Sequence, residues 1–343
     1  MLTIACYSFD DPNQACARLR VLEPARALGQ TVRLLWGAVP QGQGHRVRHD
    51  ILETGDVVLI QRVFPFPGTA PLLETIFASG KPVVYDTDDD WTSLPASHDF
   101  FPDLGQRLPL ILDTARRARL VTVSTPSLAA VFEARGARHV QVVPNCLPDA
   151  LWPPTPPPDR PVTAVGLAAT PSHRSDLAPL EMALSRLANR LGQSARWVFF
   201  GCPPDKSLFP GATVLPFSQD YGAYAARLPR LGLAIGLAPL ADTAFNRAKS
   251  PIKWMEYAAC GLAGVFADLP PYQGVVEQER TGLLVGPDPR DWCQAVERLV
   301  RDPALRKRLA CQAWEAVSRE HLLSAQAALY RQAWQAATQR GAS

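Results

Sequence analysis

A segment in the last third of the chain combines residue types that could bind a phosphate and a sugar. It reads F-N-R-A-K-S-P-I-K-W-M-E-Y-A-A-C-G from Phe245 to Gly261. Ser followed by Pro favours a helix start, because the Ser side chain accepts a first-turn N–H and Pro gives up an N–H that has no partner there. We therefore expect a helix of about ten residues that begins at Ser250 and Pro251 and ends at Gly261.

The beginning of this helix is a candidate anion site. Free backbone N–H groups and the helix dipole favour a phosphate there, and Asn246, Lys249, Ser250 and Lys253 add polar or positive side chains. Glu256 follows about one to two turns later, where its carboxylate could accept hydrogen bonds from the two hydroxyls of a ribose. The segment thus predicts a nucleotide-sugar site. A strand-to-helix junction with solvated lysines and a surface glutamate is the alternative.

The loop V-G-L-A-A-T-P-S-H-R-S-D-L is a second candidate for contact with such a donor. Its pattern predicts a strand, a turn of small residues and a helix capped by Ser175 or Asp176. Ser172, His173 and Arg174 would then lie at the carboxyl end of the strand, where a diphosphate can rest against a helix N-terminus. A capped turn whose His and Arg point into solvent would give the same pattern.

Four aspartates follow a predicted strand in the first half, in the run V-V-Y-D-T-D-D-D-W: Asp86, Asp88, Asp89 and Asp90. Carboxylates at such a position could bind a divalent metal or accept hydrogen bonds from a sugar acceptor. A metal would require the nucleotide to lie in this half, whereas the candidate nucleotide site lies in the other. We therefore expect no metal and assign Asp88, Asp89 and Asp90 to the acceptor side.

His98 lies in the same loop, among Trp91, Phe100 and Phe101. A neutral imidazole beside aromatic rings suits sugar recognition or polarisation of a reacting hydroxyl. His98 is therefore a catalytic candidate, although an isolated loop histidine often has no such role. Arg18, which follows the first predicted strand, could face the acceptor or be a surface charge.

These side chains need a scaffold that brings strand ends together. Apolar runs of about four to six residues without polar alternation are typical of parallel strands covered on both faces. Such runs alternate with helical patterns in both halves of the chain, which predicts two doubly wound α/β domains. The expected strands span residues 2–7, 31–36, 56–60, 81–85, 120–123, 139–143, 162–167, 197–200, 213–216, 231–235, 264–267 and 282–285.

A proline-rich stretch separates the two halves. Residues 145–161 contain seven prolines, which cannot sit inside a packed sheet or helix. We predict an N-terminal domain of residues 1–146, a semi-rigid linker of residues 147–161 and a C-terminal domain of residues 162–343, whose last helix could pack back on the N-terminal domain.

The composition limits the classes of function. The chain has 343 residues, a net charge of +3 and 47% hydrophobic residues, which indicates a globular protein and argues against a nucleic-acid partner. The seven cysteines form no C-x-x-C pair, so neither a zinc site nor a disulfide framework is expected. No membrane span or signal peptide is recognisable, and we expect a cytoplasmic protein. The basic stretch 108–120 leaves open a peripheral contact at the inner face of the membrane, with a packed helix and a solvated arginine face as the alternative.

The segments that carry these candidates follow one another in a defined order. They read C-A-R-L-R-V-L-E-P-A-R-A-L, V-V-Y-D-T-D-D-D-W-T-S-L-P-A-S-H, V-S-T-P-S-L-A-A-V-F, V-V-P-N-C-L-P, S-H-R-S-D-L, K-S-P-I-K-W-M-E-Y-A-A-C-G, P-P-Y and R-T-G-L-L-V. In type and order they resemble bacterial GT-B glycosyltransferases of the retaining, glycogen-synthase-like superfamily, and the K-S-x-x-K-W-x-E-Y-x-A-x-G run is the most specific of them.

The resemblance implies two Rossmann-like domains facing across a cleft. The C-terminal domain would hold a nucleotide-sugar donor and the N-terminal domain a glycan or lipid-linked acceptor, with no metal or other cofactor. Glu256 would contact the ribose, Lys249 and Ser250 would lie near the diphosphate and sugar, and His98 near the reacting sugar. The expected reaction is transfer with retention of configuration, in which the leaving diphosphate helps to deprotonate the attacking hydroxyl.

The sequence departs from that family in three places. Many relatives have two glutamates eight residues apart, but the position eight before Glu256 is Ala248. The usual Arg and Lys of the first donor-domain loop are absent, which leaves His173 and Arg174 as the nearest candidates. Residues 11–17 lack the glycines that let a ligand approach the backbone. Two alternatives follow: a catalytically silent protein that binds a sugar nucleotide or glycan, and a nucleotide-sugar epimerase. A dehydrogenase is not expected, because no G-x-G-x-x-G follows the first strand.

Overall fold

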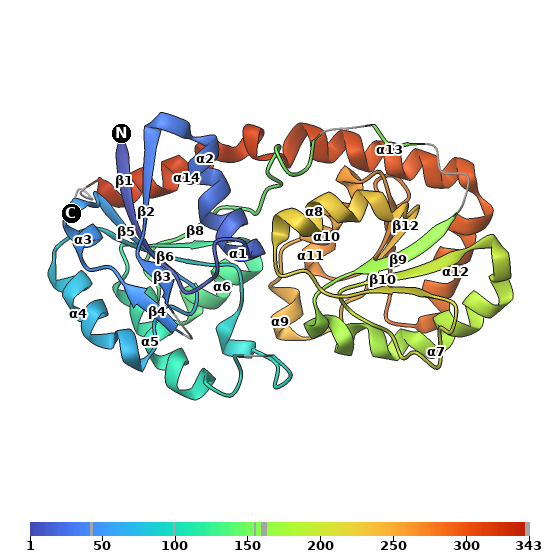
Figure 1. Ribbon diagram of the computed structural model, residues 1–343, viewed down its shortest axis with the longest axis horizontal. Coiled ribbons are helices and arrows are strands. Elements are labelled where there is room, and N and C mark those ends of the chain that lie inside the picture. Colours follow the sequence, from blue (N-terminus) through green and yellow to red (C-terminus); the bar gives the residue numbers. More distant parts are fainter. Residues whose placement is uncertain (42–43, 99, 154–155, 159–162, 340–343) are drawn as a thin grey trace. The chain divides into compact units, whose positions relative to one another are not determined.

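The computed structural model describes residues 1–41, 44–98, 100–153, 156–158 and 163–339. Within them the chain forms two compact units (Figure 1). The first runs from Met1 to Cys146 and also takes Ala248–Ser250 and the chain from Leu323 onward; the second runs from Leu147 to Arg247 and from Pro251 to Leu322. Of the expected linker, residues 154–155 and 159–161 lie outside the described residues.

The first unit is built on six parallel strands. They are β1 (Leu2–Tyr7), β2 (Val32–Trp36), β5 (Val57–Gln61), β6 (Val83–Thr87), β7 (Leu120–Val123) and β8 (Val140–Val142), in the order β2-β1-β5-β6-β7-β8. The order reverses between β1 and β5, so the topological switch point lies at the carboxyl ends of those two strands. β3 (Ala38–Gln41) and β4 (Gly44–Val47) form a separate antiparallel hairpin, which the sequence analysis did not predict.

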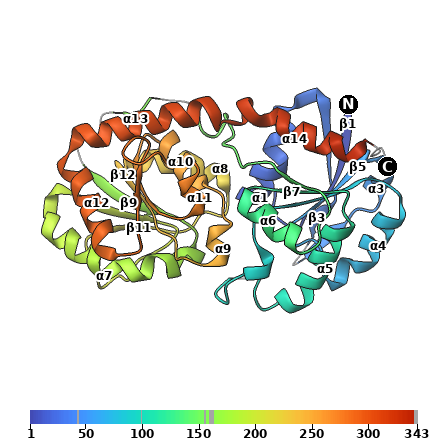
Figure 2. The same ribbon diagram turned by 180° about the vertical axis from the view of Figure 1, so that it is seen from behind.

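Helices from both ends of the chain cover this sheet. Those in the N-terminal part are α1 (Ala15–Ala17), a π-helical turn (Arg18–Leu22), α2 (Glu23–Ala27), α3 (Asp50–Thr54), α4 (Ala70–Ala78), α5 (Leu104–Arg117) and α6 (Pro126–Ala134). The last helix, α14 (Leu323–Thr338), packs against α2 and strands β5, β6 and β7 (Figure 2). Its buried Tyr330 and Trp334 join the same hydrophobic cluster as Ile4 and Leu59. The core of the first unit is therefore complete only with α14 in place.

The second unit has a sheet of the same size but another strand order. Its strands are β9 (Ala164–Ala168), β10 (Arg196–Phe200), β11 (Thr213–Leu215), β12 (Ile235–Ala238), β13 (Ala263–Ala267) and β14 (Leu283–Val285), arranged β11-β10-β9-β12-β13-β14. Its helices are α7 (Arg174–Leu191), α8 (Tyr221–Arg227), α9 (Ala244–Arg247), α10 (Ile252–Ala259), α11 (Pro270–Gln273), α12 (Pro289–Arg301) and α13 (Pro303–Glu320). The order reverses between β9 and β12, which places the switch point there.

The predicted α/β fold with two doubly wound sheets is confirmed, with one strand misplaced. Residues 231–235 were expected to form a strand, but β12 begins only at Ile235. Leu228–Leu231 form a 3-10 turn, which ends at Gly232. Gly232 has a left-handed φ of +62°, a conformation that glycine adopts without steric cost. Helix α7 packs its apolar face into the second unit, with Leu177, Leu184 and Leu187 all buried.

Helix α10 ends as predicted and begins differently. Gly261 has φ +66°, and the N–H groups of Gly261 and Leu262 bond to the carbonyls of Ala258 and Tyr257, both at 2.9 Å, which is a Schellman motif. The start predicted at Ser250 and Pro251 is wrong: Pro251 itself is the N-cap, without a side-chain bond. The Ser250 hydroxyl instead accepts a hydrogen bond from Asn145 Nδ2 at 3.1 Å.

The basic stretch 108–120 lies mainly in α5. Ile111 and Ala115 are buried, whereas Arg116 and Arg117 are exposed, and Arg117 donates to Glu74 at 2.5 and 2.9 Å. This is the pattern of a helix packed on its own domain with an outward arginine face. In the part of the chain that the structure describes, no helix combines the length and apolar character that crossing a membrane requires.

Candidate functional site

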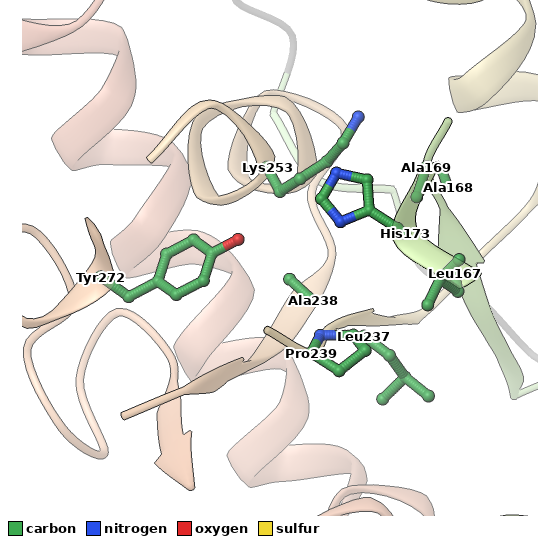
Figure 3. Close-up of a pocket in the computed structure, with 9 residues that line it drawn as sticks. All are labelled: Leu167, Ala168, Ala169, His173, Leu237, Ala238, Pro239, Lys253 and Tyr272. Carbon is green, nitrogen blue, oxygen red and sulfur yellow. The ribbon is translucent and has the colours of Figure 1, made fainter. Parts of the chain in front are cut away.

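A small hollow opens at the switch point of the second sheet, at the carboxyl ends of β9 and β12. Apolar residues from both strand ends line most of it, and three polar side chains complete the lining (Figure 3). Its enclosed space of about 10 Å³ holds about one water molecule, far less than a pocket that encloses a drug-sized ligand, so the hollow suits one small part of a larger molecule. The lining residues are Leu167, Ala168, Ala169, His173, Leu237, Ala238, Pro239, Lys253 and Tyr272.

A buried carboxylate orients His173 in this hollow. His173 ends the 3-10 turn Pro171–His173 that leads into α7, and its Nδ1 lies 2.7 Å from Asp176 Oδ2. The other oxygen of Asp176 accepts hydrogen bonds from the Ala241 N–H and from Asn246 Nδ2, both at 2.8 Å. The predicted cap by Ser175 or Asp176 is wrong, because α7 begins at Arg174 with no side-chain cap. Asp176 instead ties the start of α7 to the segment after β12.

Glu256 is buried on α10 with donors from its own unit around it. Its carboxylate accepts hydrogen bonds from the hydroxyls of Tyr221 at 3.2 Å and Tyr224 at 2.8 Å, and from Lys253 Nζ at 2.7 Å. Burial raises the pKa of both tyrosines well above their ordinary value, and the charge of Glu256 adds to the effect, so both stay neutral donors. A carboxylate has about four acceptor positions, and these three bonds leave one for a ligand hydroxyl.

The two tyrosines were missed by the sequence analysis. They lie three residues apart on α8, which begins after the cap Asp220, and such spacing places two side chains on one helix face. That spacing was the available signal. Their partner, Glu256, lies more than thirty positions further on in the sequence.

Residues 246–256, which the sequence analysis predicted as one site, are divided between the two units. Ala248, Lys249 and Ser250 cluster with the first unit, whereas Lys253 and Glu256 belong to the second. Ala248 is buried, and its carbonyl accepts a hydrogen bond from Thr125 Oγ1 at 2.8 Å. Lys249 is half-buried.

The remaining donor-side candidates have partners within the second unit. Asn246 is buried, and its side-chain amide donates to Asp176 and to the Ala241 carbonyl, so its contribution is to hold Asp176. The Ser172 hydroxyl lies 2.6 Å from Thr170 Oγ1. Arg174 donates to Glu181 at 2.6 Å. Of the three loop candidates, His173 is the one that lines the hollow.

The carboxyl end of the first sheet carries a buried ionic cluster around Arg62. This residue directly follows β5 and has a left-handed φ of +48°. Its Nη1 donates to both oxygens of Asp10 at 2.9 and 2.8 Å, and its Nη2 to Asp89 at 2.6 Å; its Nε lies 3.3 Å from Asp88. Three carboxylates thus surround one guanidinium. Burial, and then the charge of Asp89, raises the pKa of Asp88 to about 6, with Arg62 opposing the rise.

Arg62 and Asp10 were missed by the sequence analysis. Arg62 comes directly after the apolar run V-V-L-I and Gln61, where a parallel sheet presents its carboxyl edge, and that position was the available signal. Among the residues that the structure describes, no group of three or more His, Cys, Asp or Glu is arranged to hold a metal ion.

The other acceptor-side candidates differ in their surroundings. Asp90 is buried and caps the 3-10 turn Trp91–Ser93 through the Thr92 N–H at 2.9 Å. Arg18 lies in the π-helical turn, 3.5 Å from Glu23. His98 is half-buried, and its Nδ1 accepts a hydrogen bond from the Phe100 N–H at 3.2 Å. The His98 ring stacks on Phe100 with the centroids 5.8 Å apart.

Residues 220–332, about a third of the chain, match the family model described as glycosyl transferase-like. They include Tyr221, Tyr224, Lys253, Glu256 and Tyr272. No curated protein matches the sequence.

Solved structures with the same fold cover nearly the whole chain. Sucrose-phosphate synthase from Thermosynechococcus elongatus has a TM-score of 0.70 and 14% identity, over 98% of this chain and 100% of that one. HepE from Anabaena, in complex with UDP-glucose, has a TM-score of 0.69 and 14% identity over the same shares. A glycosyltransferase from Rickettsia africae has a TM-score of 0.66 and 12% identity over 99% of both chains. The fold is that of the GT-B glycosyltransferases, as predicted.

Proposed function

We propose that this protein transfers a sugar from a nucleotide-sugar donor to a hydroxyl acceptor, with retention of configuration and without a metal. One observation carries the proposal: the hollow at the switch point of the second sheet, lined by His173 and Lys253 over apolar strand ends. Ligands of open α/β sheets bind at such a point, and basic side chains there suit a diphosphate. The UDP-glucose complex of HepE supports a nucleotide sugar as the donor.

In this proposal the second unit holds the donor. His173 and Lys253 bind the diphosphate, with Ser172, Arg174 and Asn246 in or behind the loops that form the site. Glu256 accepts a ribose hydroxyl at its remaining acceptor position.

The first unit holds the acceptor, a glycan or a lipid-linked sugar, through Arg18, Asp88 and Asp89. Lys249, Ser250 and His98 act near the reacting sugar. Asp90, which caps the turn after these aspartates, acts by shaping their loop. The reaction takes place in the cytoplasm, or at the inner face of the membrane if the acceptor is lipid-linked.

The chemistry needs only groups that the chain and the donor supply. The bond between the anomeric carbon and the diphosphate oxygen breaks, and a bond from that carbon to the acceptor oxygen forms on the same face. The acceptor proton passes to the leaving diphosphate. Positive side chains at the diphosphate stabilise the charge that develops there, which is the principal means by which such sites lower a barrier.

A catalytically silent binding protein is the second candidate. Two observations favour it: a buried Ala248 at the position of the first glutamate in many relatives, and a Glu256 carboxylate that already accepts three intramolecular hydrogen bonds. Sugar transfer to any acceptor by the purified protein would exclude it.

The donor site is tested by calorimetric titration with UDP, GDP, dTDP, ADP and CMP and their sugar conjugates, with and without a magnesium chelator. We expect one nucleotide family to bind regardless of the chelator. Glu256→Ala should weaken that binding by about 1.5–3 kcal/mol, the contribution of a hydrogen bond to a charged group. Glu256→Gln, which keeps the size of the side chain, should weaken it less.

The matched control is Glu315→Ala, on the exposed surface of α13, which should leave binding unchanged. If Glu256→Ala binds as the wild type does, the assignment of the ribose contact is wrong. If the folded protein binds none of these compounds, the donor site itself is wrong.

A further inference from the structure

The hydrogen bonds around Asp176 determine which nitrogen of His173 carries a proton. A carboxylate without a proton can only accept hydrogen bonds, and both oxygens of Asp176 are occupied: Oδ1 by two N–H donors and Oδ2 by His173 Nδ1. Nδ1 is therefore protonated. A neutral His173 would then present Nε2 as an acceptor, and only the imidazolium can donate from Nε2.

The charges around the hollow favour the imidazolium. Asp176 is buried, with its side chain 4% exposed, and a buried carboxylate next to an imidazole stabilises the protonated ring. Three pairs of opposite charge also lie on the elements that form the hollow. These pairs are Arg174 with Glu181, Lys253 with Glu256, and Arg247 with Asp242.

The remaining titratable groups near His173 and Asp176 are neutral. Burial, and then the field of Tyr257, raises the pKa of Tyr272 well above its ordinary value. Burial raises the pKa of Cys202 to about 11, with Arg174 opposing the rise. Neither group supplies a positive charge to Asp176, whereas His173 Nδ1 lies 2.7 Å from its Oδ2.

A diphosphate is the ligand that such a ring would recognise. His173 lies in the hollow beside Lys253 (Figure 3), over apolar side chains from the ends of β9 and β12. In surroundings of low polarity a donor with a full charge binds an anionic oxygen more strongly than a neutral donor does. A neutral imidazole would turn a lone pair toward the same oxygen and repel it.

We propose that His173 binds the donor diphosphate as an imidazolium, that Asp176 is the positioning residue that favours its protonation, and that donor binding takes up a proton at pH values where the ring of the free protein is neutral, an inference that rests on the proposed donor site. In the reaction the imidazolium also stabilises the charge on the departing diphosphate. Affinity is full at low pH and falls as pH rises through the titration of the ring, by at most about tenfold per pH unit, since one proton is involved.

The test uses titration calorimetry of the full chain with UDP-glucose, then GDP-mannose and dTDP-glucose, between pH 5.5 and pH 8.5. Sugar conjugates are the right probes because their diphosphate has no terminal phosphate, the group that titrates near pH 6. Repeating each titration in buffers of different ionisation enthalpy counts the protons taken up. The wild type should take up close to one proton per sugar nucleotide on the alkaline side of the titration.

Two variants distinguish the role of Asp176 in positioning His173 from a general loss of structure. Asp176→Asn keeps the shape but removes the charge, so binding at pH 7.5 should weaken about tenfold, the value of a charge-assisted hydrogen bond, and approach the wild type at pH 5.5. His173→Gln can donate but cannot titrate, so its binding should be weaker and independent of pH. The matched controls Asp291→Asn and His139→Gln, at exposed positions, should keep the wild-type pH profile.

The outcomes are distinct. Binding by the wild type without proton uptake, or proton uptake that persists in His173→Gln, overturns the inference and leaves the donor site in place. No binding of any of the three sugar nucleotides at any pH, by protein whose circular dichroism shows it folded, overturns the proposed function itself.

Discussion

The carboxyl edges of the two sheets carry different side chains. Counted along the chain, the first sheet has the strand order 2-1-3-4-5-6, and the second has 3-2-1-4-5-6, and both orders have one switch point beside their first strand. At the first switch point, charged side chains are packed together around Arg62. At the second, charges are paired at the margins and an apolar hollow remains.

This difference agrees with the proposed division between an acceptor and a donor. The Arg62 cluster combines three carboxylates with one guanidinium, which leaves an excess of negative charge suited to hydroxyl groups and unsuited to a phosphate. The hollow of the second unit has basic side chains, His173 and Lys253, over apolar strand ends. Under the proposed function, doubly wound sheets serve both partners of a transfer reaction, because the residues that follow the strands, and not the sheet, set the chemistry.

Removing the centre of the first cluster should have the largest effect. Arg62→Met leaves the buried Asp10 and the half-buried Asp88 and Asp89 without their cation, and breaking a buried ion pair costs about 3–5 kcal/mol. Urea unfolding measures the loss. Arg117→Met is the matched control, because its pair with Glu74 is exposed and should contribute at most about 1 kcal/mol. Equal losses in the two variants would show that the cluster is not a stabilising centre.

Asp88 should make the stability of the first unit depend on pH. Its pKa is about 6 in the folded protein and near 3.9 unfolded, so the folded state binds the proton more tightly. Stability is therefore full below about pH 4 and is lost as pH rises to about 6, by up to about 3 kcal/mol. Asp88→Asn should remove that loss. The free energy of unfolding of the variant, relative to that of the wild type, should therefore be higher at pH 7 than at pH 4.

The matched control for this pH profile is Asp103→Asn, which removes an exposed carboxylate and should follow the wild type. An Asp88→Asn profile that runs parallel to the wild type between pH 4 and pH 7 would contradict the assignment of the shift to Asp88.

The smallest effect is expected in the second unit, at Tyr257. Its hydroxyl donates to the Leu237 carbonyl at 2.8 Å and accepts from the Ala168 N–H at 3.1 Å, where the paired register of β9 and β12 has ended. Tyr257→Phe leaves both backbone groups unpaired. The cost should be about 1–2 kcal/mol, that of leaving buried backbone groups unpaired.

Tyr330→Phe provides the comparison in the first unit, since that hydroxyl donates to the Pro144 carbonyl at 2.9 Å. It should reduce stability without changing sugar-nucleotide affinity, whereas Tyr257→Phe should change both. A Tyr257→Phe protein with wild-type affinity would mean that the two strand ends do not shape the donor site.

Short sequence patterns correctly predicted the strands and helix ends that depend only on residues close in sequence. The apolar runs of β1 and β7 give their bounds without error, and Gly261 ends α10 because its left-handed φ has no steric penalty in glycine. His173 was placed correctly at a strand end because a parallel strand always presents its last residues at the same edge.

The errors concern residues whose partners are distant in sequence. Ser250 does not cap α10, because its hydroxyl bonds to Asn145, 105 positions away. Arg62 was missed because its significance depends on aspartates that follow two other strands. Glu256 was expected at the surface or at a ribose, and its tyrosine partners lie on another helix. No spacing within one segment reveals such contacts.

Helix α14 has a consequence for the order in which the protein folds during synthesis. The core of the first unit includes Leu323, Tyr330 and Trp334 alongside Ile4 and Leu59, so it cannot close until those late residues have left the ribosome. Domains usually fold as they emerge, the N-terminal one first, but here the second unit is made in full while the first still lacks a helix. Until α14 emerges, the N-terminal strands expose the apolar surface that it later covers, the kind of surface that makes a nascent chain prone to aggregate.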